Sequence, residues 1–444
     1  MGGKTKEMLV NIDFDWDWVM IGLAIYALLI VFSPDFVLGT FSVHVIEFRL
    51  SDLYLLGLFS YLIYFLIESE CGLFYPSIFF PALAYVASFF LAAIVSLVKI
   101  IGISFGIEST FFALKYLEYF LIFFITANLV RSEKHVNFLL EFLLGSVTIS
   151  GGLLILTRFF DRLNLSLTID LFSFNPDFTS YPQRATIPFA KGPGPSAEIL
   201  YLLIPFALFF FVNTDRKRKK IIYSLYLIVL GSALILTGSR GPMAATFLSL
   251  AFLGPLLERK VIPWLVGGLV GAGVLAITFP YVGKKISSIF LLFSEGLCSS
   301  DSMCVRITEV WPRGIEKFLE NPIFGACLAS FPTSDAQYIR ILADQVIIGL
   351  ATFVFFIASL FFYLLKFRGK ASSAWEEGIF SAIMISIFAL LINGVTVTAF
   401  EPVRAMEPFW FLLGLVFALE KFDRPEERKL SVYSCSKIKY KNSR

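Results

Sequence analysis

The residues Gly238-Ser239-Arg240-Gly241-Pro242 are the first whose types and spacing suit chemistry. They separate two apolar runs. Pro242 suits the first turn of the second run, so Ser239 and Arg240 would stand just ahead of a helix N-terminus. Backbone N–H groups there, together with a guanidinium, would bind an anion such as phosphate. The alternative is that Arg240 only extends its guanidinium to lipid headgroups, and the sequence leaves both open.

The segment 306–321 carries two stripes at helical spacing. The basic stripe is Arg306, Arg313 and Lys317, and the apolar stripe is Ile307, Trp311, Ile315 and Phe318. These faces predict an amphipathic helix on the bilayer surface, kinked or interrupted near Pro312 and Gly314. The alternative, which this segment alone favours, is that the glutamate three residues after each base only neutralises the stripe.

Asp335 and Tyr338 come just before another apolar run. A carboxylate at the mouth of a membrane helix would accept a proton from a sugar hydroxyl. It would equally serve as a helix cap, and the residue taken alone favours the cap.

A Gly- and Pro-rich turn precedes the run that begins near position 194. Arg184 and Lys191 add positive charge to this turn, and we interpret both as substrate-binding candidates. Glu198 is expected in the first turn of the following helix, where it would complement the helix dipole. That placement predicts a structural role for Glu198.

Several kinds of site have no support in the sequence. The chain contains no P-loop, dinucleotide fingerprint, zinc-protease motif or hydrolase elbow. Its five cysteines form no CxxC pair, and its two histidines have no metal-binding neighbours. We therefore expect no metal, no cofactor and no nucleic-acid partner. Cys298 and Cys304 share one loop, and either form a disulfide in an oxidising compartment or remain free thiols.

The elements that would hold these residues are membrane helices. Hydrophobic residues make up 57% of the 444 positions and charged residues only 16%, against about 25% charged in a soluble domain. A spanning helix needs about 20 mostly apolar residues. The chain offers about twelve such runs, near 18–38, 51–68, 74–97, 108–130, 136–157, 194–212, 221–237, 242–257, 262–281, 341–365, 377–398 and 405–421. This predicts an all-α polytopic membrane protein with about 12 transmembrane helices.

The polar segments between the runs predict the orientation. If both termini are cytoplasmic, more than half of the 37 Lys and Arg residues fall on the inside. Two long loops, 158–193 and 282–340, are then extracytoplasmic, and the second carries the amphipathic helix. The helices occupy 1–157, 194–281 and 341–421, followed by a cytoplasmic tail over 422–444. Because functional residues gather on loops held by a rigid scaffold, we expect the chemistry outside the cytoplasm.

Taken in order, these motifs resemble the O-antigen polymerase and ligase superfamily. The resemblance depends on the Arg240-Gly241 pair after a membrane helix and on the Arg306-led helix that closes at Asn321-Pro-Ile-Phe-Gly325. It also depends on Asp335-Ala-Gln-Tyr338 with Gly349 further on, where Ala336 departs from the usual second polar residue. The clear part covers about residues 180 to 350, and the helix count extends it to most of the chain.

The resemblance implies a GT-C-like enzyme that uses an undecaprenyl-diphosphate-linked glycan as donor, without metal or nucleotide. Arg240 and Arg306 would hold the diphosphate, and Asp335 would assist the acceptor hydroxyl. Ser239, Arg313, Tyr338, Arg184 and Lys191 would contribute to substrate binding. The expected partners are the lipid-linked donor and acceptor, the lipid bilayer and a chain-length regulator.

Three functions remain open. Ligases of this superfamily carry a histidine at the position of Asp335, whereas polymerases often carry an aspartate. The resemblance therefore favours a polymerase in the bacterial inner membrane over an O-antigen ligase. A secondary transporter is a third reading. It requires charged residues near the middle of helices, for which the sequence offers Lys115 and Glu118, two residues that would simply pair.

Overall fold

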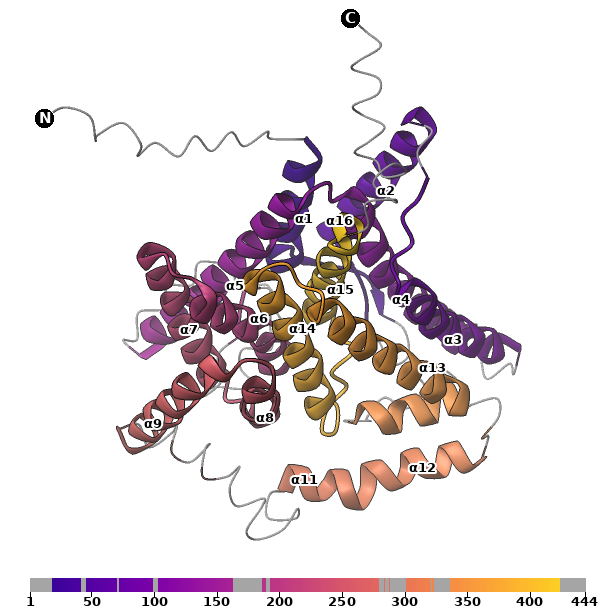
Figure 1. The fold of residues 1–444 in the computed structure, drawn as a ribbon. Helices are drawn as coiled ribbons and strands as arrows, with labels where there is room; N and C mark the ends of the chain where they lie inside the picture. The colour runs from indigo at the N-terminus through magenta and orange to yellow at the C-terminus, as the bar shows by residue number, and fades with distance from the viewer. Residues whose placement is uncertain are drawn as a thin grey trace, which may run out of the picture.

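A computed structural model of the chain describes residues 18–40, 45–69, 72–98, 103–162, 186–188, 192–278, 283, 287, 301–320, 322 and 336–423. Figure 1 shows a helical bundle in these residues. The longer helices are α1 (Trp18–Phe32), α2 (Leu50–Ser69), α3 (Phe79–Val98), α4 (Ile103–Leu129), α5 (Glu133–Arg162), α6 (Pro193–Asn213), α7 (Lys217–Thr237), α8 (Arg240–Leu257), α9 (Ile262–Thr278), α13 (Gln337–Arg368), α14 (Ala374–Asn393) and α15 (Val403–Ala418). Each corresponds to one of the predicted runs. The short elements are η2 (Arg259–Val261), α11 (Asp301–Val305), a π-helical segment η4 (Arg306–Val310), α12 (Trp311–Glu320) and α16 (Glu420–Asp423).

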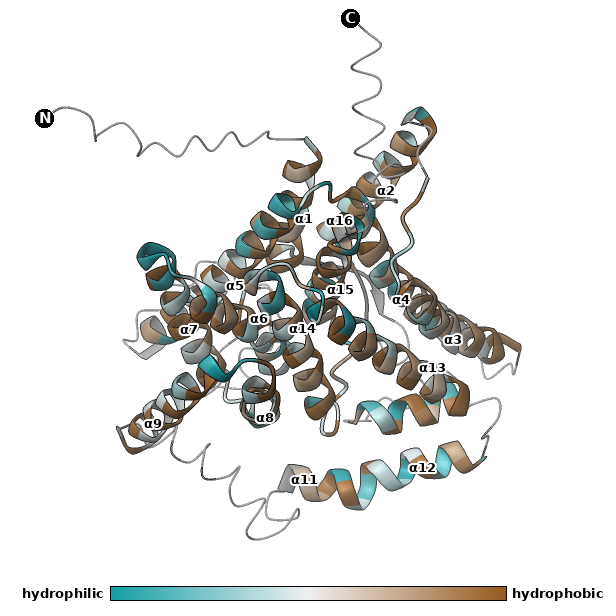
Figure 2. Cartoon of the chain, in the orientation of Figure 1, coloured by the Kyte–Doolittle hydropathy of each residue, from teal (hydrophilic) through white to brown (hydrophobic). Residues whose placement is uncertain are grey.

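The helices have the length and composition of a membrane protein. Within the described residues, nine helices are long and apolar enough to cross a membrane, namely α2 to α8, α13 and α14. The helices α1, α9 and α15 have 15, 17 and 16 residues. Figure 2 shows hydrophobic residues, in brown, along most of these helices. The prediction of a helical membrane protein is confirmed, whereas the expected count of about twelve spans is not.

A short hairpin follows α1, where the sequence predicted a longer helix. Strand β1 (Asp35–Thr40) pairs antiparallel with β2 (Val45–Arg49). Pro34 disfavours helical backbone at Ser33, so α1 ends at Phe32. The β-branched and aromatic residues of β2 suit an extended strand. The hairpin places Arg49 directly before the first turn of α2.

Helix α6 lies at the centre of the bundle. Nearly all of its side chains are buried, and it packs against α5, α7, α8, α14 and α15. An apolar sequence on every face allows α6 to be buried by other helices on every side. Beside it, α15 approaches α4 so closely that a Cβ added at Gly414 would lie 2.7 Å from the Cβ of Thr126. Only glycine permits this approach.

Helix α16 holds the ends of two other helices. The Glu420 carboxylate accepts a hydrogen bond of 2.9 Å from the backbone N–H of Ser77, just before α3. The Lys421 ammonium donates to the carbonyls of Asn128 and Val130, at 3.0 and 2.9 Å, where α4 ends. An acid at a helix N-terminus and a base at a C-terminus both complement the helix dipole. We call this end of the bundle the α16 end. The opposite end, where α15 begins, is called the site end, after the site described below.

Helix α13 is broken at Val346. This residue has φ 55° and ψ −158°, so α13 consists of two helical pieces on either side of it. A β-branched residue rarely adopts a positive φ. Gly349 is required next to the break, because a Cβ there would lie 2.2 Å from the Cβ of Gln345. The break places the first piece of α13, with its polar side chains, within the bundle.

Candidate functional site

A group of buried or largely buried polar side chains lies where α6, α13, α14 and the segment before α15 meet. We call it the Arg340 site, and its members are Glu198, Gln337, Arg340, Asp344, Asn393 and Glu401. Arg340 Nε lies 2.8 Å from a Glu401 carboxylate oxygen and 3.4 Å from Asp344 Oδ2. Asn393 Nδ2 donates to Glu198 Oε1 at 3.0 Å. Ionisable groups inside a membrane bundle are costly and mark functional sites.

The start of α13 is attached to the segment that joins α14 to α15. The Gln337 N–H donates to the Gly394 carbonyl at 2.9 Å, and its side-chain oxygen accepts from the Phe400 N–H at 3.0 Å. The Tyr338 hydroxyl donates to the Leu391 carbonyl at 2.7 Å. These bonds fix Arg340, one turn further along, against Glu401.

The N-terminus of α8 reaches the same segment. Gly238 ends α7 in the left-handed conformation, with φ 63°, and Arg240 already begins α8. This two-residue turn is what a C-cap glycine permits. A Cβ added at Gly241 would lie 2.9 Å from Asn393 Oδ1 and 3.0 Å from Thr396 Oγ1. The backbone of α8 therefore packs directly on the end of α14.

The Glu401 carboxyl has altered acidity. Burial raises the pKa of this carboxyl above its ordinary value, and the neighbouring Arg340 guanidinium partly opposes that effect. Glu401 precedes α15 and lies outside the helices. A carboxyl with a raised pKa is better able to accept or donate a proton near neutral pH.

The structure describes five of the eight predicted site residues. Ser239 is the buried N-cap of α8, and its side chain makes no capping bond; Arg240 is half-buried beside it. Tyr338 lies at the Arg340 site. Arg306 is half-buried in η4, and Arg313 is exposed, 3.6 Å from Glu309. The remaining three residues, Arg184, Lys191 and Asp335, lie outside the described residues.

Three local predictions are corrected. Glu198 is the sixth residue of α6, not part of its first turn, and it bonds Asn393 instead of the helix N-terminus. The interruption expected near Pro312 lies just before it, because the π-helical η4 ends at Val310 and α12, with Pro312 as its second residue, follows directly. The N-cap of α13 is Ala336, which has no capping side chain.

Cys304 is disulfide-bonded. Its expected partner, Cys298, lies outside the described residues. The bond excludes the alternative in which Cys304 is a free thiol.

Several residues of the Arg340 site escaped the sequence analysis. Arg340 was assigned to the end of the second long loop, because the apolar run was read from Ile341. Glu401 and Asn393 were not singled out, since Asn393 lies inside the apolar run 377–398 and Glu401 in the short gap before the next run. The available signal was that Arg340 and Glu401 flank apolar runs and Asn393 lies inside one, where a charged or amide side chain needs a partner.

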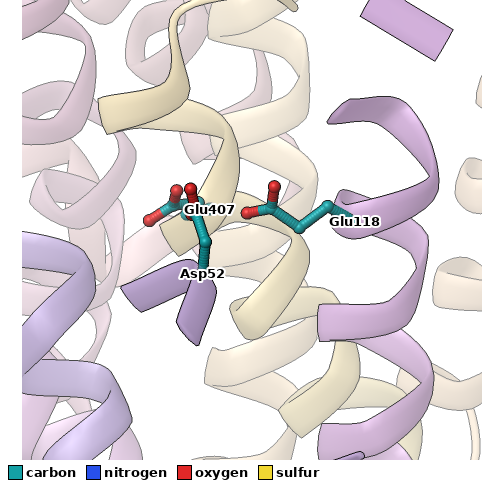
Figure 3. A group of neighbouring side chains, drawn as sticks. All are labelled: Asp52, Glu118 and Glu407. Atoms are coloured by element: carbon teal, nitrogen blue, oxygen red, sulfur yellow. The ribbon is translucent and has the colours of Figure 1, made fainter. Parts of the chain in front are cut away.

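A second charged cluster lies between α2, α4 and α15 (Figure 3). We call it the Lys115 cluster, and its members are Arg49, Asp52, Lys115, Glu118 and Glu407. The Lys115 ammonium lies 2.8 Å from Glu118, 3.2 Å from Asp52 and 3.5 Å from Glu407. Lys115 and Glu118 do pair, as the sequence suggested, but within a larger network that joins four elements.

Helix α4 contacts both the Lys115 cluster and the Arg340 site. The Tyr116 hydroxyl donates to the Phe400 carbonyl at 3.0 Å, and the Tyr119 hydroxyl donates to the Glu401 carbonyl at 3.2 Å. Lys115 lies 5.9 Å from the Tyr119 ring centroid. One face of α4 therefore contacts both the Lys115 cluster and the segment that carries Glu401.

The fold and these sites define a polytopic α-helical membrane protein with buried ionisable groups. No protein-family model matches the chain, and a comparison with curated proteins finds no match. The class follows from the fold, and a more specific function has to be argued from the sites.

Proposed function

We propose that the protein joins undecaprenyl-diphosphate-linked oligosaccharide repeat units into O-antigen or a related surface polysaccharide. The observation that supports this most is the convergence of α8 and α13 on the segment 393–401. The first turns of these two helices carry two of the three motifs on which the resemblance depends. The helix that carries the third motif, α12, packs against α13. Motifs separated by about a hundred residues thus lie around one part of the bundle.

In this proposal, Arg240 and the N-terminus of α8 bind the diphosphate of the donor. Arg306 supplies a second guanidinium, and Ser239, Arg313, Arg184 and Lys191 contribute further contacts. As the bond between the anomeric carbon and the diphosphate oxygen breaks, negative charge develops on that oxygen. Two guanidinium groups stabilise this charge without a metal.

The acceptor hydroxyl attacks the anomeric carbon from the opposite face and inverts it. Its proton passes to a carboxylate, for which the sequence offers Asp335 and the structure adds Glu401. Tyr338 helps to position the acceptor. Arg340 acts as a positioning residue, because it holds Glu401 at 2.8 Å.

The proposed location is the bacterial inner membrane. Both termini and the α16 end are cytoplasmic, and the site end faces outward. This orientation agrees with the basic residues of the short loops. It also gives the site end direct access to substrates carried on the outer leaflet.

The test is a reconstituted reaction with purified protein and a synthetic undecaprenyl-diphosphate oligosaccharide. We expect a ladder of lengthened lipid-linked products on a gel, unchanged by EDTA. Arg240→Ala should abolish the ladder, whereas Arg259→Ala, just beyond the other end of α8, should retain it. Equal ladders from both variants would remove Arg240 from the mechanism, and a ladder that needs added Mg²⁺ would refute the metal-free reaction.

The ligase alternative is separated in the same assay. A ligase leaves the donor alone unchanged and transfers the glycan only when lipid A core is added. Product formed only with that acceptor would replace the polymerase by the ligase.

A second candidate function, secondary transport, is favoured by one observation. Transporters use broken helices and charged groups within the membrane, and the break in α13 lies close to Arg340 and Asp344. Uptake of a solute into proteoliposomes, with no lipid-linked product, would support transport over glycosyl transfer.

A further inference from the structure

The Lys115 cluster has an unbalanced charge. Its three carboxylates come from α2, α4 and α15, and its two bases are Arg49 at the end of β2 and Lys115 on α4. Arg49 Nη1 lies 3.0 Å from Glu407 Oε1, with side-chain exposures of 3% and 0%. Three acids against two bases leave one negative charge in excess. A buried excess charge is costly, so such a group binds a cation or takes up a proton.

Glu407 Oε2 and the Tyr26 hydroxyl are among the buried polar atoms of the cluster that have no hydrogen-bond partner within the described residues. Glu407 Oε2 accepts no hydrogen bond, although Oε1 is close to both Arg49 and Lys115. The Tyr26 hydroxyl, on α1, also has no partner, and Tyr26 is 1% exposed. This hydroxyl lies within electrostatic range of Arg49, Asp52, Glu118 and Glu407. An unoccupied acceptor and an unoccupied hydroxyl at the same place indicate that a ligand belongs there.

The geometry favours a proton over a metal ion as this ligand. One oxygen from each of Asp52, Glu118 and Glu407 lies within 4.8 Å of the others, a spacing that a cation would fit. The Lys115 ammonium is already within 3.5 Å of all three carboxylates. A metal bound between these oxygens would lie against a positive charge. A proton bonded to a carboxylate oxygen supplies the missing positive charge with less of this repulsion.

We propose that the Lys115 cluster is a proton-binding site, in which Asp52, Glu118 and Glu407 share one proton taken from water. The carboxylic acid formed on one of them brings the cluster to neutrality. Its hydroxyl also becomes a donor within a group of acceptors. The proposal does not depend on glycosyl transfer, and it concerns groups that the proposed reaction does not use.

The charged and titratable groups around the shared proton come from every element packed there. They are Tyr26 on α1, Arg49 on β2, Asp52 on α2, Lys115, Glu118 and Tyr119 on α4, and Glu407 on α15. Arg404, one turn before Glu407, donates to the carbonyls of Val31 and Ser33. Asp52, Glu118 and Lys115 keep side-chain exposures of 13%, 18% and 22%, so the cluster is not fully enclosed by protein.

The test measures the protonated carboxyl directly by infrared difference spectroscopy of the purified full-length protein between acid and alkaline pH. The wild type should show the carbonyl band of a buried carboxylic acid at neutral pH. Replacing any one carboxyl by its amide leaves two acids and two bases, so no proton is needed. Glu407→Gln, Glu118→Gln and Asp52→Asn should therefore all lose the same band. The matched control is Glu141→Gln, because Glu141 pairs with one base, Lys219, at 2.6 Å.

The pH dependence of unfolding gives a second measurement, which can still be made if one of the variants fails to fold. The folded protein still holds a proton at pH values where the unfolded chain has released it. The free energy of unfolding should therefore fall as pH rises, until the folded protein releases the proton as well. One proton corresponds to about a tenfold change in the unfolding equilibrium constant per pH unit. Asp52→Asn should remove this dependence. Lys115→Met, which leaves three acids and one base, should make it steeper.

Two results would overturn the proposal. One is a neutral-pH band that is absent in the wild type or unchanged in all three amide variants. The other is stabilisation by sodium over choline at constant pH that Glu407→Gln removes, since the site would then bind a metal cation.

Discussion

Two substitutions at Val346 test the break in α13, because the break determines which of the two variants is the more stable. Val346 has φ 55° and ψ −158°, a conformation essentially confined to glycine. Such a residue costs on the order of 1–3 kcal/mol. We compare Val346→Gly with Val346→Ala, because both variants lose the buried side chain and differ only in backbone freedom.

The expected magnitude follows from two opposing terms. Glycine removes strain of about 2 kcal/mol, and its greater freedom in the unfolded chain costs about 1 kcal/mol. Val346→Gly should therefore be more stable than Val346→Ala by about 1 kcal/mol. In a regular helix the order is reversed, because glycine is about 1 kcal/mol worse than alanine. Ala351→Gly, on an exposed face of the second piece of α13, is the control for that ordinary order.

The assay is reversible unfolding of the purified protein in mixed micelles with increasing SDS, followed by tryptophan fluorescence. If Val346→Ala is the more stable of the two variants, residue 346 is helical in solution. The argument that places Asp344 and Gln345 at a break in α13 would then be wrong.

Three further predictions concern helix ends and the Arg340 site. Gly241→Ala should lower the thermal unfolding midpoint in detergent, because its Cβ would lie 2.9 Å from Asn393 Oδ1, whereas Gly231→Ala, with nothing within 4 Å, should raise it or leave it unchanged. Lys421→Met should destabilise the protein by about 1 kcal/mol or more in the same measurement, since two carbonyls at the end of α4 lose their donor. Arg340→Gln should reduce the rate of product formation at saturating donor and shift the pH profile, because Glu401 loses its ion pair; an unchanged profile would mean that Arg340 does not position Glu401.

The sequence was sufficient for the helices because their signal is local. A run of about 20 apolar residues has few alternatives to a membrane helix. Every predicted run contains a helix, and in the part of the chain that the structure describes nine of these helices are long and apolar enough to cross a membrane. The hairpin before α2 was missed because an apolar strand and the end of an apolar helix look alike in composition. Only the position of Pro34 distinguishes them.

The candidate sites were harder to predict because they combine residues distant in the chain. Lys115 and Glu118 were correctly paired from their spacing, but nothing local connects Glu118 with Glu407. The break at Val346 could not be predicted from the sequence either, because a valine rarely adopts the positive φ that this residue has. Gly349 was noted as part of a motif. The reason that this position needs a glycine is the nearby Gln345 side chain, which only the three-dimensional structure reveals.

The contacts of α16 have a consequence for how the protein is made. Glu420 bonds Ser77, 343 positions earlier in the chain, and Lys421 holds the end of α4. Ribosomes deliver α3 and α4 to the membrane long before α15 and α16 exist, so these helices must wait in the bilayer with their ends uncapped. The last helices then complete the bundle. A nascent chain that stops before Glu420 would lack these caps, and quality-control proteases could recognise it by its unsecured α3 and α4.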